Sequence, residues 1–284
     1  MLAIFNSRNT GFARGFQTTS FTRLTYYCAA AWVGIVMAGM TLFAADPNTY
    51  QPTAGKPDFA KHTQKMYETA KTRFTAQTNN PEAAWQFGRA CYDWADYADS
   101  NSQRVSIANE GIAACKMLIA RDSDSVPGHY YLGMNLGQVA QTKKLGALKI
   151  VDQMEIEFNF VLGLDPQFDR GGADRNLGLL YLEAPGWPMS IGNNAKARQH
   201  LLKALRLAPD YPENALNWIE AELKWGSKSA ALNQLKMLDA AWADARKKFV
   251  GEEWAASWAD WETRRESARK EASQQPKAAG ARNR

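Results

Sequence analysis

Residue types that carry out catalysis or bind metals are few in this chain, and their spacing fits no familiar reaction. The three histidines are His62, His129 and His200; no two stand at the spacing of metal ligands, and none belongs to an H-E-x-x-H motif. The stretch around Trp187 differs from a nucleophile elbow, because Pro188 stands where the first glycine is required. We therefore expect no catalytic residue, no metal site and no cofactor, and we predict that the protein is not an enzyme.

Two other features admit both a chemical and a structural interpretation. Gly171 and Gly172 precede a helical pattern, where they could expose backbone N–H groups to an anion, although a simple chain turn is the commoner role. Cys91 and Cys115 fall on the two helices of one predicted hairpin, so a disulfide is conceivable in an oxidising compartment. We favour two buried free thiols, since free cysteine packs as a small apolar side chain.

The elements that would position any site come from an internal repeat. Phe87-Gly88, Leu132-Gly133 and Leu177-Gly178 are the same pair of a large apolar residue and a glycine, and they recur every 45 residues. Each pair belongs to a helical pattern that a second apolar helix follows, and the later two of these second helices end before Pro166 and Pro209. Similarity at a fixed period of this size is typical of solenoids and arrays.

This pattern resembles the tetratricopeptide repeat, in which a large apolar residue and a glycine lie in helix A, followed by an aromatic residue, small and large residues in helix B, and a proline. The third repeat supplies every position: Leu177, Gly178, Tyr181, Ala197, Leu201, Ala204 and Pro209. The first repeat lacks the proline, the second has Met154 at the small position, and the fourth has Trp218 in place of glycine. The usual period is 34 residues, and the additional residues here fall between helices A and B. The resemblance implies an all-α, TPR-like right-handed solenoid of helical hairpins with lengthened, irregular repeats.

The repeat also sets the expected organisation of the chain. We predict a signal peptide or N-terminal membrane anchor at residues 1–45, a linker at 46–56, a helical repeat domain at 57–272 and a disordered basic tail at 273–284. Within the domain, the expected repeats cover 82–122, 127–166, 172–209 and 212–240, and a capping helix covers 252–272. The capping helix carries Trp254, Trp258 and Trp261 along one side, which favours core packing over an oligomer or membrane contact.

The N-terminal segment directs the protein out of the cytoplasm. A basic stretch ends at Arg23, an apolar run extends from Leu24 to Ala45, and polar residues follow. This order is typical of a signal peptide, and the run is also long enough to span a bilayer as an uncleaved anchor. Because basic residues stay inside in both cases, residues 46–284 are expected in the periplasm or another extracytoplasmic space.

The net charge of +5 comes from the two ends of the chain. Residues 1–45 contain three arginines and no acidic residue, and the last eight residues add Lys277, Arg282 and Arg284. The part between them has a net charge of −1. Because this part has no basic stripe, we expect no nucleic-acid partner, and the membrane is expected to be involved only through the N-terminal segment.

Binding is expected on the inner face of the array, which is lined by helix A residues that packing does not use. Counted from each glycine, the candidate groove residues are Trp85, Arg89, Tyr92, Asp93, Tyr130, Met134, Gln138, Arg175, Leu179 and Glu183. Aromatic side chains with a few fixed charges suit a peptide or ligand groove, and an arginine here could hold a carboxylate through two hydrogen bonds. The alternative is that these side chains are solvated or join neighbouring repeats. Trp187, on a loop between Pro185 and Pro188, is either a partner anchor or a lid over its own hairpin.

The stretch from Ala147 to Gly226 resembles a narrower group, the periplasmic T-components of tripartite (TRAP-type) transporters. The resemblance is carried by an Asp-Pro turn at Asp165, the Gly171-Gly172 pair, an Ala-Pro-Gly interruption at Ala184 and the helix that contains His200. It implies a partnership with an extracytoplasmic solute-binding protein, and an assembly of several copies. The chain lacks the acylation cysteine common in that group, since Cys28 stands early in the apolar run. A general envelope interaction module, or a small-molecule or lipid carrier, are the alternatives.

Overall fold

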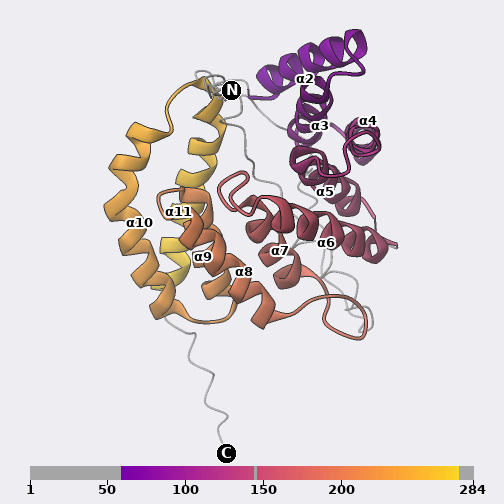
Figure 1. Ribbon diagram of the computed structural model, residues 1–284. Helices are drawn as coiled ribbons and strands as arrows, with labels where there is room; N and C mark the ends of the chain where they lie inside the picture. The colour runs from indigo at the N-terminus through magenta and orange to yellow at the C-terminus, as the bar shows by residue number, and fades with distance from the viewer. Residues whose placement is uncertain (1–58, 144–145, 275–284) are drawn as a thin grey trace, which may run out of the picture.

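The computed structural model describes residues 59–143 and 146–274, and over these residues it contains helices and no strand (Figure 1). The predicted N-terminal segment and linker, and nearly all of the predicted tail, lie outside the described residues. The helices are α2 (Phe59–Ala76), α3 (Pro81–Ala95), α4 (Asn101–Ile119), α5 (Val126–Gln141), α6 (Ala147–Leu164), α7 (Gly172–Glu183), α8 (Asn194–Leu207), α9 (Pro212–Lys224), α10 (Lys228–Lys248), the 3₁₀ helix η3 (Glu252–Trp254) and α11 (Ala255–Ser273).

Capping residues fix where several helices begin. Asn80 accepts hydrogen bonds from the backbone N–H groups of Glu82 and Ala83 at the start of α3. Ser125 and Asn193 do the same for α5 and α8. These side chains satisfy N–H groups that have no partner within their own helix, and the prolines in the first turns of α3, α5 and α9 need no such partner.

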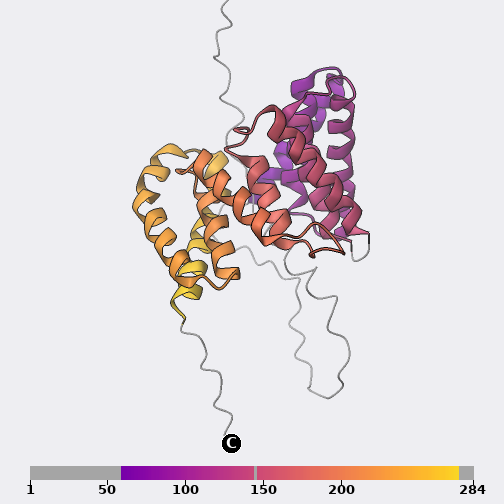
Figure 2. The same cartoon turned by 60° about the horizontal axis from the view of Figure 1, so that its bottom comes forward.

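Successive helices pair as antiparallel hairpins: α3 with α4, α5 with α6, α7 with α8, and α9 with α10. Helix α2 precedes the first hairpin and packs on α3, while α11 closes the array against α9 and α10. Figure 2 shows that α9, α10 and α11 form a bundle beside the longer stack of α2 to α8. The fold class predicted from the repeat is therefore confirmed as an all-α array of TPR-like hairpins.

The repeated glycines let the two helices of a hairpin approach closely. A Cβ atom added to Gly88 would lie 2.5 Å from Cys115 Sγ, and one added to Gly178 would lie 2.6 Å from Leu201 Cγ. At Gly133 the nearest atom would be a ring carbon of Phe158, at 2.9 Å. In each hairpin a helix B side chain thus occupies the space that a side chain at the helix A glycine would need.

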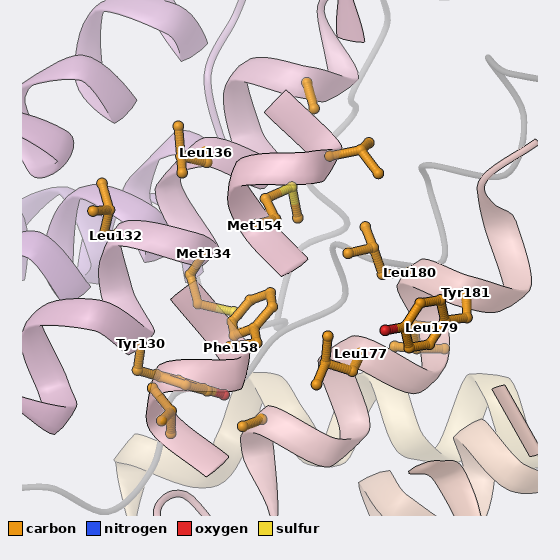
Figure 3. Close-up of a cluster of buried hydrophobic side chains, with 14 of the residues drawn as sticks. Tyr130, Leu132, Met134, Leu136, Met154, Phe158, Leu177, Leu179, Leu180 and Tyr181 are labelled. Atoms are coloured by element: carbon orange, nitrogen blue, oxygen red, sulfur yellow. The ribbon is translucent and has the colours of Figure 1, made fainter. Parts of the chain in front are cut away.

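Three clusters of buried apolar side chains form the core. The largest joins α5, α6 and α7, with Tyr130, Met154, Phe158 and Leu180 among its members (Figure 3). A second lies among α9, α10 and α11, and a third joins α2, α3 and α4. Among the described helices, none combines the length and the apolar character needed to cross a bilayer.

One element boundary differs from the one expected. Helix α10 continues to Lys248, beyond residue 240, where the fourth repeat was expected to end. No glycine or proline interrupts residues 228–248, so the helix runs on to the turn at Gly251. Trp258 and Trp261 are buried in the second cluster, in agreement with core packing. Cys91 and Cys115 are buried free thiols.

Candidate functional site

The candidate groove residues lie on α3, α5 and α7, but most of them are covered. Trp85, Arg89 and Glu183 are partly exposed. The other seven are buried: Tyr92, Asp93, Tyr130, Met134, Gln138, Arg175 and Leu179. The structure gives the buried ones a packing role between repeats, which was the alternative interpretation of the sequence. Partner binding by this set as a whole stays a prediction.

Gln138 joins the first two repeats. Its Nε2 atom donates to Asp96 Oδ1 at 2.7 Å and to the backbone oxygen of Tyr92 at 3.3 Å. Arg104 of α4 donates to Gln138 Oε1 at 2.6 Å. One turn earlier, Asn135 donates to the backbone oxygen of Gly88 at 2.8 Å. These bonds connect α3, α4 and α5 where apolar packing alone would leave the relative position of the helices poorly specified.

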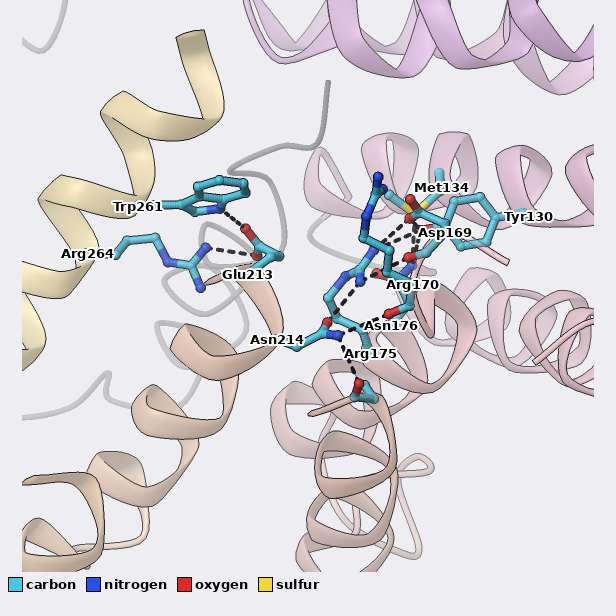
Figure 4. A network of polar contacts seen from close by, with 11 residues as sticks. Tyr130, Met134, Asp169, Arg170, Arg175, Asn176, Glu213, Asn214, Trp261 and Arg264 are labelled. Atoms are coloured by element: carbon cyan, nitrogen blue, oxygen red, sulfur yellow. Dashed lines mark hydrogen bonds and ion pairs between the residues drawn. The ribbon is translucent and has the colours of Figure 1, made fainter. Parts of the chain in front are cut away.

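Arg175 is the centre of a second network, which joins the second, third and fourth repeats (Figure 4). Its guanidinium donates to Asp169 Oδ2 at 2.6 Å and to Asn214 Oδ1 at 3.0 Å. Tyr130 donates to the same Asp169 oxygen at 2.5 Å. Burial raises the pKa of the Tyr130 hydroxyl well above its ordinary value, so this group keeps its proton and remains a donor.

The third network holds α11 against α9. Arg264 donates to Glu213 Oε1 at 2.8 Å, and Trp261 donates to Glu213 Oε2 at 2.7 Å (Figure 4). Burial alone would raise the pKa of the Glu213 carboxyl, but the guanidinium groups of Arg264 and Arg175 outweigh it and hold that pKa below its ordinary value. Glu213 therefore stays charged, and its charge is compensated.

Asp93 differs from Asp169 and Glu213, whose carboxylates accept hydrogen bonds from arginine, tyrosine or tryptophan donors. Its Oδ1 atom is buried and accepts no hydrogen bond, and its Oδ2 atom lies 3.5 Å from Arg89 Nε. Burial, which outweighs the nearby Arg89, raises the pKa of the Asp93 carboxyl to about 7. Trp85, Arg89 and Asp93 follow each other at four-residue intervals and so share one face of α3. A buried acceptor without a donor is rare in native proteins, which makes this face a candidate binding site.

Trp187 lies on the loop between α7 and α8 and is 89% exposed. The loop is held by its own backbone: Gly192 N–H donates to the oxygen of Pro185 at 2.9 Å, and Asn193 N–H donates to the oxygen of Tyr181 at 2.8 Å. The bond between Trp187 and Pro188 is cis. Because the Trp187 side chain is exposed, the indole does not cover its own hairpin, and the lid interpretation is wrong.

The sequence did not predict that the turn before α7 contacts the fourth repeat and the residues that follow it. Asp169 and Arg170 have positive φ angles of 52° and 57°, and Gly171 continues the turn at 75°. The Arg170 guanidinium lies 5.1–5.3 Å from the ring centroids of Tyr211, Phe249 and Trp254. The glycine pair thus serves the turn, as favoured, because a Cβ on Gly172 would lie 2.6 Å from the Tyr130 hydroxyl. The charged pair Asp169-Arg170 before the glycines is the sequence signal that could have indicated contacts between repeats.

Comparison with known proteins gives two partial likenesses. The family model described as regulator of microtubule dynamics protein 1-3 matches residues 55–151, which is 97 of the 284 residues. No curated protein matches the chain significantly. Among solved structures, the thermophilic TPR protein TTC0263 from Thermus thermophilus matches with a TM-score of 0.54 and 19% sequence identity. That match covers 74% of this chain and 92% of the other, and it shows that the chain has a TPR-like helical repeat fold.

Proposed function

We propose that this protein is a non-catalytic, extracytoplasmic scaffold that holds a protein partner on the partly exposed face of α3 that carries Trp85, Arg89 and Asp93. A TPR-like fold is typical of proteins that bind other proteins, because stacked hairpins present a long surface on a rigid core. The observation that carries the proposal is the unsatisfied Asp93 oxygen beside Arg89 and Trp85. A partner that donates an N–H or ammonium group to this oxygen would remove an existing penalty of burial.

The residues around Asp93 suit a peptide segment more than a small metabolite. Arg89 can donate to a backbone carbonyl or a carboxylate of the partner. Trp85 offers an aromatic surface, which stacks on Tyr131 with ring centroids 5.8 Å apart. Such a combination of an aromatic anchor and paired charges is common at protein interfaces.

The sequence motifs between Ala147 and Gly226 point to an extracytoplasmic solute-binding protein of a TRAP-type uptake system as that partner, with several copies of the chain in the assembly. The proposed location, outside the cytoplasm, follows from the apolar run at residues 24–45. A general envelope interaction module is the second candidate. A small-molecule or lipid carrier is the third, and a tightly bound small molecule after purification would favour it.

The test is an affinity capture with the full chain as bait from a detergent extract of the native envelope, read by mass spectrometry. We expect one solute-binding protein to be enriched, and we expect the purified partner to bind the wild-type chain in calorimetry. Asp93→Asn keeps the shape of the side chain but replaces a charge with an amide, so it should weaken binding at least tenfold, equivalent to about 1.4 kcal/mol.

The matched control is Asp244→Asn, because Asp244 is an exposed aspartate on α10, away from α3. It should leave the affinity unchanged. Recovery of assorted envelope proteins would contradict the partnership with a solute-binding protein. Equal binding by the Asp93→Asn and Asp244→Asn chains would contradict the Asp93 site. A bound small molecule that Asp93→Asn displaces would instead support the carrier alternative.

A further inference from the structure

The loop between α7 and α8 presents apolar side chains that nothing in the described part of the chain covers. Residues 184–193 contain no charged residue, and at the tip Trp187 is 89% and Met189 53% exposed. Met189 N–H donates to the oxygen of Gly186 at 3.1 Å, so the tip is an ordered turn. The backbone bonds at both ends of the loop therefore hold these two side chains outward at no further loss of chain entropy.

The loop lies beside the first half of α6. The Tyr181 hydroxyl, just before the loop, donates to Glu155 of α6 at 2.5 Å, and Lys196 Nζ, just after it, lies 3.9 Å from the same carboxylate. In Figure 1 the loop projects at the lower right of the molecule, below α6. The apolar tip is thus followed, beside α6, by the half-exposed Lys196.

We propose that this loop rests on the surface of a lipid bilayer, with Trp187 and Met189 at the level of the headgroups. The inference rests on the proposed extracytoplasmic location and on residues 24–45 remaining as an uncleaved anchor. Tryptophan is enriched at membrane–water interfaces, because its ring is apolar and its N–H is polar. Lys196, which follows the loop, would be attracted to anionic lipids.

Two features favour a bilayer over a protein as the occupant. Two apolar side chains on one loop bury much less than the roughly 1,000 Å² that a specific protein interface needs, whereas shallow insertion into a bilayer requires no matching pocket. Thirteen residues, 46–58, separate the apolar run from α2, and they reach about 43 Å when extended. With residues 24–45 in a bilayer, a linker of this length would raise the effective concentration of the loop at the membrane and favour even a weak contact.

The test uses the full chain reconstituted in vesicles of phosphatidylcholine and phosphatidylglycerol, with a polarity-sensitive fluorophore on Met189→Cys. Cys28→Ser removes the thiol in the apolar run, and the buried Cys91 and Cys115 stay. We expect a blue-shifted emission at position 189 and quenching by spin-labelled lipids. The same label on Met237→Cys, a 65% exposed position on α10, should report water. Trp187→Ser should reduce the shift at position 189, and added salt should reduce it further.

The possible outcomes distinguish the membrane anchor from the contact of the loop with lipid. The inference would be overturned, and the anchor left intact, if the chain sediments with vesicles while the labels at positions 189 and 237 have the same emission. A chain that stays in the supernatant would overturn both. A blue shift that requires an added protein and occurs without lipid would assign the loop to a protein partner instead. Binding at Asp93 does not enter this measurement, so the proposed scaffold function can stand or fall separately.

Discussion

At the residue scale, amide side chains on successive A helices repeat one task. Asn135 donates to Gly88 of the preceding repeat, Asn176 donates to Tyr130, and Asn214 donates to the backbone oxygen of Arg170. The spacing of each pair is close to the repeat length, so the polar contacts recur together with the glycines. Like the Asn135 Oδ1 atom, one oxygen of the Asp93 carboxyl is buried without a donor, but Asp93 can ionise. Its protonation should therefore depend on folding.

Asp93 predicts a stability that falls as pH rises. The pKa of its carboxyl is about 7 in the folded protein, against an ordinary value of 3.8, so the folded chain holds this proton more tightly than the unfolded chain does. The contribution is fully present below about pH 4 and is lost as pH rises through about 7. A tenfold difference in proton affinity between the two states corresponds to about 1.4 kcal/mol. Urea unfolding at several pH values should show this fall for the wild-type chain and a flatter profile for Asp93→Asn.

Asp244→Asn is the control for this measurement, because the exposed Asp244 side chain should not alter the profile between pH 4 and 7. Parallel profiles for the wild-type and Asp93→Asn chains would show that Asp93 ionises normally in the folded protein.

Gly178→Ala tests the close approach of α7 and α8. The new methyl group would lie 2.6 Å from Leu201 Cγ and 3.0 Å from the Leu201 nitrogen, so the hairpin must open. We expect a loss of about 1–3 kcal/mol in the free energy of unfolding from overpacking, although alanine favours a helix over glycine by up to about 1 kcal/mol. Gly163→Ala on α6 meets no atom within 4 Å and should be neutral or stabilising. A Gly178→Ala chain as stable as Gly163→Ala would contradict the packing argument.

At the element scale, α11 is the cap of the array. It covers the fourth hairpin through Trp258 and Trp261, whose rings contact each other. The Trp261 ring also contacts Tyr211 and Phe249. Its polar contacts with α9 include the bonds that Arg264 donates to Glu213 and Glu220. Terminal units of repeat arrays need such a cover, because the last hairpin would otherwise expose the face that inner hairpins bury. The cap should consequently contribute more to stability than its position at the end of the chain suggests.

Trp261→Ala should destabilise the protein by about 3–5 kcal/mol, because it leaves a large cavity. It also removes one of the donors to the buried Glu213. Thermal unfolding followed by circular dichroism measures the effect. Trp187→Ala provides the matched control, since that side chain is exposed and its removal should change stability by less than about 0.5 kcal/mol. Equal melting temperatures for the two variants would argue against α11 as a structural cap.

At the scale of the whole molecule, two bundles meet through several polar contacts, the Arg198–Glu222 and Glu183–Lys224 ion pairs among them. The stack of α2 to α8 and the bundle of α9 to α11 are joined where Arg175 and Arg170 face Asn214 and Tyr211 (Figure 4). Asn214 also donates to the backbone oxygen of Ala204, so one side chain connects α9 with the turn before α7 and with α8. This junction should set how strongly the two bundles unfold as one unit.

Asn214→Ala should loosen the junction. It removes an acceptor from the buried Arg175 and a donor from two backbone oxygens, and each group left unsatisfied costs about 1–3 kcal/mol. Hydrogen exchange should accelerate in α9, α10 and α11 more than in α3 to α6. Asn233→Ala, at an exposed position on α10, is the control and should leave exchange unchanged. A uniform increase over the whole chain would indicate a single cooperative unit instead.

The sequence by itself determined the helical hairpins and the positions of close approach. The period of 45 residues and the Gly88, Gly133 and Gly178 positions suffice for this, because helix periodicity and small-residue contacts are local patterns that survive in a linear sequence. The partial exposure of Arg89 and the burial of Arg175 were decided only by the tertiary structure, although both stand within one helical turn of a repeated glycine. Which side chain is covered depends on the neighbouring repeat, and for Arg175 that neighbour is Asn214, 39 residues away. The outward position of Trp187 was likewise fixed by backbone bonds within a loop whose shape no periodicity encodes.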